Sequence, residues 1–104
     1  MNRGSSSMLR HIAMFRLKDD APEGTLESLS RELARLAESI SEISTYTYGR
    51  DLGLRDGNFD FAVVADFENA AAFSGYVNHP VHQAFIQDHL TPVVAERVAL
   101  QFEF

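Results

Sequence analysis

The segment from Phe59 to Phe67 limits the fold of this chain more than any other, because apolar side chains recur in it at every second residue. Such alternation is typical of a β-strand that rests one face on a core. The residues expected to face inward are Phe59, Phe61, Val63, Ala65 and Phe67. Leu9–Leu17 alternates in the same way and places His11 on the same face as Phe15. We therefore expect these two strands to share one buried face of a sheet.

Leucine and isoleucine side chains in residues 26–40 recur at the spacing of an α-helix, opposite a charged face. This pattern predicts an amphipathic helix of about five turns. Asn69 is placed to cap a second helix that runs through Tyr76, and the His79-Pro80 pair is expected to interrupt it. A further helical segment is predicted over Val81–Leu90.

Two more strands complete the pattern. Ile43–Arg50 is rich in Thr and Tyr, Val98–Phe104 alternates again, and residues 51–58 between the second and third strands carry turn-forming side chains. The order βαββαβ predicts an α+β, ferredoxin-like protomer in which two helices cover one face of a four-stranded antiparallel sheet. We expect one domain over residues 8–104. The polar residues 1–7 are expected to be a disordered tail, and they lack the apolar stretch of a signal peptide.

The face of this sheet that the helices leave uncovered is also predicted to be apolar. The residues expected on it are Ile12, Met14, Tyr46, Tyr48, Ala62, Val64 and Ala99. Soluble monomers seldom expose an apolar patch of this size. Packing two sheets face to face would bury the patch, so we expect the partner of this protein to be a second copy of itself, in a homodimer.

Charge and cysteine content exclude several classes of protein. The formal charge is −6 and the basic residues are scattered, which argues against a nucleic-acid partner. The chain has no cysteine, which excludes disulfides and agrees with the reducing cytoplasm in which we expect the protein to be located. The longest apolar run of the predicted domain, residues 61–65, is much shorter than the roughly 20 residues that span a bilayer, so no membrane association is expected.

Histidine and tyrosine side chains cluster in residues 76–82, which read Tyr-Val-Asn-His-Pro-Val-His. Histidine changes its charge near neutral pH, and tyrosine donates or accepts a hydrogen bond in a polarised site. His11 could act as a general acid or base tuned by burial, and Tyr76 could polarise a carbonyl group. His79 and His82 are three residues apart, which would place them on one side of a helical turn.

The same residues have structural interpretations. His11 could be a core histidine whose ring nitrogens are satisfied by backbone or water, and Tyr76 could be a core aromatic at helical spacing from Phe73. No metal is expected, because the histidines lack convergent carboxylate or cysteine ligands at a specific spacing. The sequence contains no dinucleotide fingerprint and no phosphate-binding glycine loop, so no cofactor is predicted.

Three segments of the chain resemble the stress-responsive A/B-barrel domain family, often called Dabb. They are His11–Leu17, Phe61–Glu68 and Tyr76–His82. The resemblance covers residues 8–104 and implies a ferredoxin-like protomer that dimerises into an α+β barrel. In a characterised plant cyclase of this family, histidine and tyrosine in the pocket between helices and sheet cyclise a linear polyketide. The resemblance assigns these roles to His11, Tyr76 and His82, whereas a further histidine of that enzyme aligns with Phe61.

Two functions remain open from the sequence. In the first, the dimer binds or transforms a small carbonyl or polyketide-like compound, with His82 as base, Tyr76 as hydroxyl donor and His11 as the orienting group. The residues expected to contact this compound are Phe61, Val63 and His79. In the second, the protein is a non-catalytic, stress-associated homodimer in which His11 and His82 form a structural hydrogen-bonded pair. A haem-handling or oxygenase role, known in the wider dimeric barrel superfamily, is a third alternative.

Overall fold

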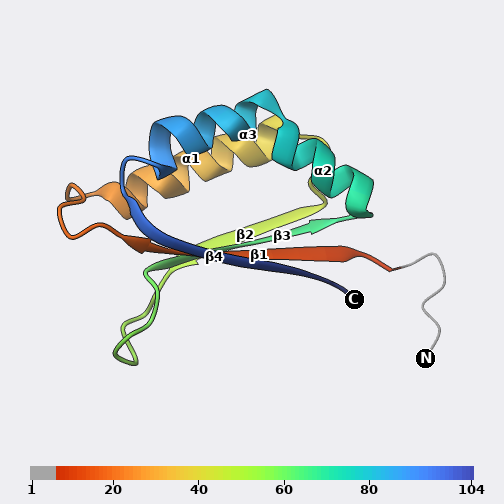
Figure 1. Ribbon diagram of the computed structural model, residues 1–104. Helices are drawn as coiled ribbons and strands as arrows, with labels where there is room; N and C mark the ends of the chain where they lie inside the picture. The colour runs from red at the N-terminus through yellow and green to blue at the C-terminus, as the bar shows by residue number, and fades with distance from the viewer. Residues whose placement is uncertain (1–6) are drawn as a thin grey trace.

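In residues 7–104, which are those that the computed structural model describes, four strands form one antiparallel sheet in the order β2-β3-β1-β4. Helices cover one face of this sheet (Figure 1). The elements follow one another as β1 (Leu9–Leu17), α1 (Thr25–Ser39), β2 (Thr45–Arg50), β3 (Phe61–Phe67), α2 (Ala70–Asn78), α3 (Pro80–Phe85), η2 (Ile86–Leu90) and β4 (Val94–Glu103). The predicted α+β fold with its four-stranded antiparallel sheet is confirmed. Of the predicted disordered tail, residues 1–6 lie outside the described residues.

Several element boundaries differ from those predicted, and β2 begins at Thr45 rather than at Ile43. β3 begins at Phe61 rather than at Phe59, and β4 begins at Val94 rather than at Val98. The helical segment predicted over Val81–Leu90 is divided, because α3 ends at Phe85 and the π-helical turn η2 follows it. Turns of this kind are rare and occur often near functional sites.

Leucines at helical spacing hold α1 against the sheet. Leu29, Leu33 and Leu36 are all buried on the inner side of the helix. The helix begins after Gly24, whose φ of 84° lies in the left-handed region that glycine enters without a steric penalty. It ends at Ser39, and the next residue, Ile40, is extended and buried. One amphipathic helix therefore covers much of the sheet and supplies one wall of the space above it.

The His79-Pro80 pair separates α2 from α3, as predicted. Asn69 caps α2, because its side-chain oxygen accepts a hydrogen bond from the Ala72 amide at 2.9 Å. At the junction, His79 Nδ1 accepts a hydrogen bond from the Val81 amide at 3.1 Å, and Pro80 takes the first position of α3. His82 consequently lies in the first turn of the new helix.

The face of the sheet away from the helices, here called the open face, carries an apolar patch. Ile12 pairs with Val64 and Met14 pairs with Ala62, so the prediction for these four residues is confirmed. β4 extends the patch with Val98, Leu100 and Phe102, which are exposed.

Three residues predicted on the open face lie on the helix-covered face instead. Tyr46 pairs with Ala65 and Tyr48 pairs with Val63, while Ala99 pairs with Ala13. Directly paired residues project to the same side of a sheet, and Ala13, Val63 and Ala65 are all buried beneath the helices. The predicted parity of β2 and β4 was wrong by one residue, which moves every side chain of a strand to the other face.

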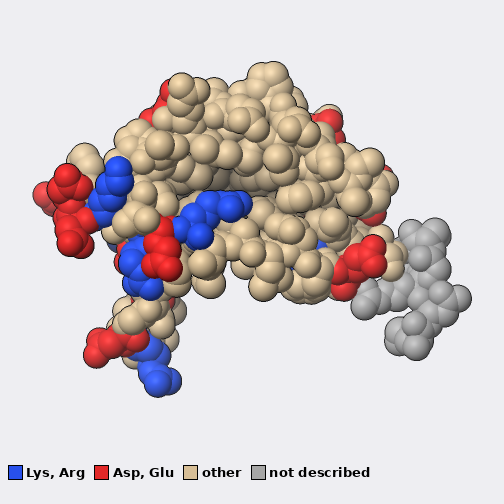
Figure 2. All heavy atoms as spheres, in the orientation of Figure 1, with Lys and Arg blue, Asp and Glu red and all other residues tan. Residues whose placement is uncertain are grey.

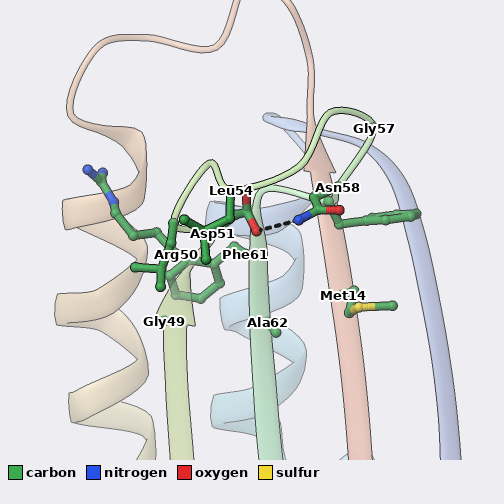
Figure 3. A pocket seen from close by; sticks show the side chains of 11 residues that line it. Met14, Gly49, Arg50, Asp51, Leu54, Gly57, Asn58, Phe61 and Ala62 are labelled. Carbon is green, nitrogen blue, oxygen red and sulfur yellow. Dashed lines mark hydrogen bonds between the residues drawn. The ribbon is translucent and has the colours of Figure 1, made fainter.

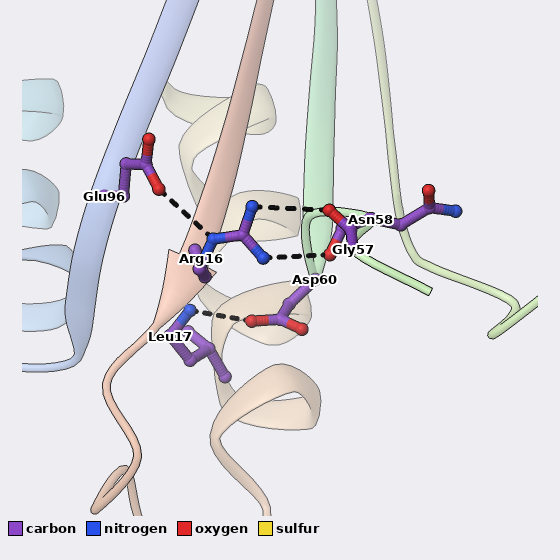
Figure 4. Close-up of polar contacts among 6 residues, drawn as sticks. All are labelled: Arg16, Leu17, Gly57, Asn58, Asp60 and Glu96. Carbon is purple, nitrogen blue, oxygen red and sulfur yellow. Dashed lines mark hydrogen bonds and ion pairs between the residues drawn. The ribbon is translucent and has the colours of Figure 1, made fainter. Parts of the chain in front are cut away.

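Arginine side chains fasten both ends of the open face. At one end, Arg16 Nε lies 3.2 Å from a Glu96 carboxylate oxygen, and its other nitrogens donate to the backbone oxygens of Asn58 and Gly57 (Figure 4). These contacts hold β1, β4 and the loop before β3 together. At the other end, Arg10 forms two hydrogen bonds of 2.8 and 2.9 Å with the Asp66 carboxylate, which the Thr45 hydroxyl also contacts at 2.7 Å.

Candidate functional site

A small, partly enclosed cavity lies between the helices and the sheet. The centre of a water-sized molecule can reach about 30 Å³ of it, which is room for about two waters. The surface is visibly hollowed between the helical layer and the sheet (Figure 2). The polar residues that line the cavity are His11, Tyr46, Tyr76, His82 and Arg97. Its walls are otherwise apolar and come from Ala13, Phe15, Leu33, Val63, Phe85, Ile86 and Leu90.

β1 places His11 on the helix-covered face, as the alternation of the strand predicted. Its side chain is buried, and the Gln101 side-chain amide on β4 donates to His11 Nδ1 at 2.9 Å. An imidazole that accepts at Nδ1 is neutral and carries its proton on Nε2. Burial is the main cause that lowers the pKa of His11 to about 4, and the nearby positive charge of Arg97 acts in the same direction. His11 is therefore uncharged at neutral pH.

The buried Tyr76 and the partly buried Tyr46 form a hydroxyl pair beside His11. Their two oxygens are 2.8 Å apart, and burial raises the pKa of both hydroxyl groups. When Tyr46 donates to Tyr76, the proton of the Tyr76 hydroxyl remains free to donate to a ligand. The ring of Tyr76 also packs against Phe67, with centroids 5.1 Å apart. Tyr76 is thus both a core aromatic, as one interpretation predicted, and a polar group of the cavity.

His82 packs directly on Tyr76, with ring centroids 4.1 Å apart. Its Nδ1 donates to the Val77 backbone oxygen at 3.2 Å, because a carbonyl oxygen can only accept. The neutral ring then has an unprotonated Nε2 that can accept a proton. Burial is the main cause that lowers the pKa of His82, whereas its bond to Val77 acts in the opposite direction. His82 is therefore a neutral base held in one tautomer.

His11 and His82 do not form the hydrogen-bonded pair of the structural interpretation. Within residues 7–104, the bonded ring nitrogen of His11 has Gln101 as its partner and that of His82 has the Val77 backbone. The prediction that the two histidines and Tyr76 share one cavity agrees with this geometry. Their catalytic roles stay a prediction.

Of the three residues predicted to contact the ligand, one lines the cavity and two do not. Val63 lines the cavity. Phe61 is buried on the same face of the sheet but stacks on Tyr48, at a centroid distance of 6.4 Å, and is not part of the cavity lining. His79 is occupied in capping α3 and also lies outside the lining.

Sequence reasoning missed three polar residues of this site, which are Tyr46, Arg97 and Gln101. Tyr46 was placed on the wrong face of the sheet. Arg97 was left outside the last strand, although it pairs with Phe15 within β4. Only the pairing of β4 with β1, which sets Ala99 opposite Ala13, places Arg97 and Gln101 on the face of His11.

A larger hollow lies elsewhere, between residues 49–59 and the open face (Figure 3). This hollow is open to solvent and has a volume of about 530 Å³, and Met14 and Ala62 form its floor. Asp51 and Asn58 are joined across its loop by a hydrogen bond of 3.0 Å. Its floor is part of the apolar patch of the open face, and no histidine lines it.

Within residues 7–104, no group of three or more histidine, cysteine, aspartate or glutamate side chains gathers to hold a metal ion. In the same residues, no helix has the length and apolar character needed to cross a membrane. The chemistry available in the cavity is instead that of a neutral base, a hydroxyl donor and a guanidinium group. This set can transfer a proton and stabilise developing negative charge.

Solved structures with this architecture include a dimeric ferredoxin-like protein of unknown function from Thermobifida fusca. It is 40% identical, with a TM-score of 0.87, and the match covers 95% of this chain and 92% of that one. Hydroxynitrile lyase from Passiflora edulis is similar in fold, at 21% identity and a TM-score of 0.83, over 95% of this chain and 94% of the lyase.

Among curated proteins, an uncharacterised protein of Streptomyces coelicolor is 26% identical over 94 residues, which cover 86% of this chain and 97% of that protein. Residues 9–104 match the family model described as the stress responsive A/B barrel domain. This match includes every strand and helix of the sheet and its cover. The chain therefore belongs to the stress responsive A/B barrel domain family.

Proposed function

We propose that this protein binds a small carbonyl compound in the cavity and catalyses proton transfer at the carbon next to the carbonyl group. The observation that carries this proposal is the pairing of His82 with Tyr76. A neutral imidazole with its Nδ1 bound to Val77 lies 4.1 Å, centroid to centroid, from the ring of a tyrosine whose hydroxyl is itself fixed by Tyr46. A base and a hydrogen-bond donor are thus held side by side among apolar walls.

In the proposed step, His82 Nε2 removes a proton from the carbon adjacent to the carbonyl. The electron pair of that C–H bond forms the C=C bond of an enolate, and the carbonyl π pair moves to oxygen. The Tyr76 hydroxyl donates a hydrogen bond to this oxygen and stabilises its negative charge. The imidazolium of His82 then returns the proton to the carbon, so that no other reactant is consumed. His11 orients the compound through its Nε2–H.

The size of the cavity favours a small carbonyl compound over a polyketide-like chain, since the interior has room for about two waters. The existence of a lyase with this fold supports the idea that such a scaffold can hold an active site. The identity of that enzyme to this chain, 21%, supports the fold and nothing more specific.

We also propose that the protein is a homodimer that joins two open faces. The apolar patch around Ile12, Met14 and Val64 supports this assembly, as does the 40% identical relative, which is a dimeric protein. The cytoplasmic location and the lack of a nucleic-acid partner remain predictions from the sequence.

The test of the catalytic proposal is hydrogen–deuterium exchange at the carbon next to the carbonyl in small aldehydes and ketones, followed by NMR in D₂O. The unmodified protein should accelerate exchange, and His82→Gln should lower the accelerated rate by about 10²–10⁴-fold. His89→Gln is a matched control, because His89 lies outside the cavity and contacts Glu32 at 3.6 Å. Exchange that is absent for the whole panel, or equal in His82→Gln, would refute the proposal in favour of the non-catalytic homodimer.

A further inference from the structure

We propose that Arg97 makes this cavity a binding site for a carboxylate, so that its ligand is a short carboxylic acid that also bears a carbonyl group. Binding of the carbonyl group rests on the function proposed above, whereas binding of the carboxylate is a new inference.

The position of Arg97 is determined by the register of β4. Arg97 pairs with Phe15 and therefore projects to the helix-covered face, whereas Glu96 pairs with Arg16 on the open face. The Arg97 side chain lines the cavity together with His11 and His82, yet the residue as a whole is exposed. The space-filling view shows basic side-chain atoms lying in the hollow between helices and sheet (Figure 2). Because Arg97 lines the cavity and is exposed, it stands where a ligand would enter.

Arg97 has no acidic partner within residues 7–104. The other arginines that lie on strands, Arg10, Arg16 and Arg50, each pair with a carboxylate. Glu96 is adjacent to Arg97 in sequence, but its carboxylate is bound to Arg16 on the opposite face (Figure 4). None of the residues that line the cavity is acidic. The described part of the chain therefore leaves a positive charge at the cavity mouth without a counter-charge.

A carboxylate is the group that matches this charge. A guanidinium binds a carboxylate through two parallel, charge-assisted hydrogen bonds, and such pairs gain strength where water is partly excluded. The charge of Arg97 acts to lower the pKa of His11, Tyr76 and His82, although burial raises the pKa of Tyr76 overall, so three of the four polar groups of the interior experience it. An uncharged carbonyl compound would leave this field unbalanced, whereas a carboxylate would compensate it.

The small volume of the cavity limits the length of the carboxylic acid that can bind. The interior accepts about two waters, which is enough for a carbonyl group beside Tyr76 and His82. The carboxylate of a short acid would then remain at the mouth, against Arg97. A long chain would have to displace the walls that Phe85, Ile86 and Leu90 form.

The experiment is an NMR titration of the histidine imidazole signals with three matched sets of small molecules. The first set is pyruvate and 4-oxopentanoate, which separate carbonyl and carboxylate by different lengths. The second set, acetaldehyde and butanone, lacks the carboxylate, and the third, propanoate and pentanoate, lacks the carbonyl. At least one oxo acid should bind 10-fold or more tighter than its uncharged counterpart, because a hydrogen bond to a charged group is worth about 10- to 100-fold.

Three variants isolate the contribution of Arg97. Arg97→Gln should lower the affinity for the oxo acid by about 10- to 100-fold and leave the affinity for butanone unchanged. Arg97→Lys should lose less, since it keeps the charge but not the planar pair of donors. Arg31→Gln is the control, because Arg31 is an exposed residue of α1 outside the cavity.

The outcomes separate this inference from the function on which it rests. Uncharged carbonyl compounds that bind as well as the oxo acids, with no effect of Arg97→Gln, would overturn the carboxylate site and leave the carbonyl chemistry standing. Pentanoate that binds as tightly as 4-oxopentanoate, in an Arg97-dependent way, would support the anion site and contradict the carbonyl function. Failure of all six compounds to shift any imidazole signal at tens of millimolar would overturn both.

Discussion

The buried histidine of β1 makes a quantitative prediction about acid stability. Burial lowers the pKa of His11 from 6.5 to about 4 in the folded protein, so the unfolded chain binds a proton to this residue more readily than the folded one. The stability that His11 contributes is complete above pH 6.5 and is lost as the pH falls towards 4. The expected loss from His11 alone is about 2 kcal/mol at pH 5 and about 3 kcal/mol at pH 4.

The perturbation that tests this is His11→Gln. A glutamine oxygen can accept the hydrogen bond from Gln101 that His11 Nδ1 accepts now, at 2.9 Å, and it does not titrate. Urea unfolding at several values between pH 7.5 and pH 4.5 should show a shallower decline for His11→Gln than for the unmodified protein. For a domain of this size, a difference of about 2 kcal/mol at pH 5 corresponds to roughly 8–16 °C in melting temperature.

Part of the decline will persist in the variant, because burial also lowers the pKa of His82. His89→Gln serves as control for replacing a histidine outside the cavity, since His89 is a partly exposed residue that does not line it. Equal slopes for the unmodified protein and His11→Gln would refute the reasoning. So would a direct NMR titration in which the His11 imidazole protonates with a midpoint near 6.5.

Three further outcomes are expected. Asp66→Asn should destabilise the protein by about 1–3 kcal/mol at pH 7, measured by urea unfolding, because it weakens the bonds to Arg10 and Thr45. Because Arg10 lowers the pKa of Asp66, this difference should vanish as the pH falls through the acidic range below about 4. A difference that stays constant with pH would contradict this reasoning. Tyr76→Phe should lower stability by about 1–3 kcal/mol in thermal unfolding, because it removes the 2.8 Å partner of the partly buried Tyr46 hydroxyl, and an unchanged melting temperature would count against that pair. Val64→Lys should convert the proposed dimer to monomer in light scattering at micromolar concentration, because it introduces an unpaired charge in the open-face patch, and a dimer that survives would exclude this interface.

The parts of the fold that the sequence predicted correctly are those in which the bulkiest apolar side chains of an element fall on one face. In β1 and β3, Phe15, Phe61 and Phe67 share one parity, so the inward residues could be assigned although the other face is apolar as well. The buried leucines of α1 likewise recur at helical spacing on one face of the helix. Asn69 and the His79-Pro80 pair act locally, through the backbone next to them, and were also identified.

The parts that the sequence did not predict lack that contrast. β2 reads Thr-Tyr-Thr-Tyr, and both residue types suit a covered or an uncovered face, so the position of Tyr46 depended on its pairing with Ala65. The start of β4 contains Glu96 and Arg97, two charged residues in succession, which obscures the alternation. The contribution of Arg97 and Gln101 to the cavity arises from strand pairing over long sequence separations, which no local pattern contains.

The alternation of β1 has a consequence for how members of such a lineage can diverge. Odd-numbered positions such as His11 and Ala13 belong to the cavity, whereas Ile12 and Met14 belong to the open face. Substitutions in the first set can therefore change the cavity while the second set stays apolar, and the reverse is equally open. An insertion, in contrast, affects both sets of residues at once. Inserting one residue before His11 would exchange the two sets. The His11 imidazole would leave the cavity, and the apolar side chains of Ile12 and Met14 would leave the open face.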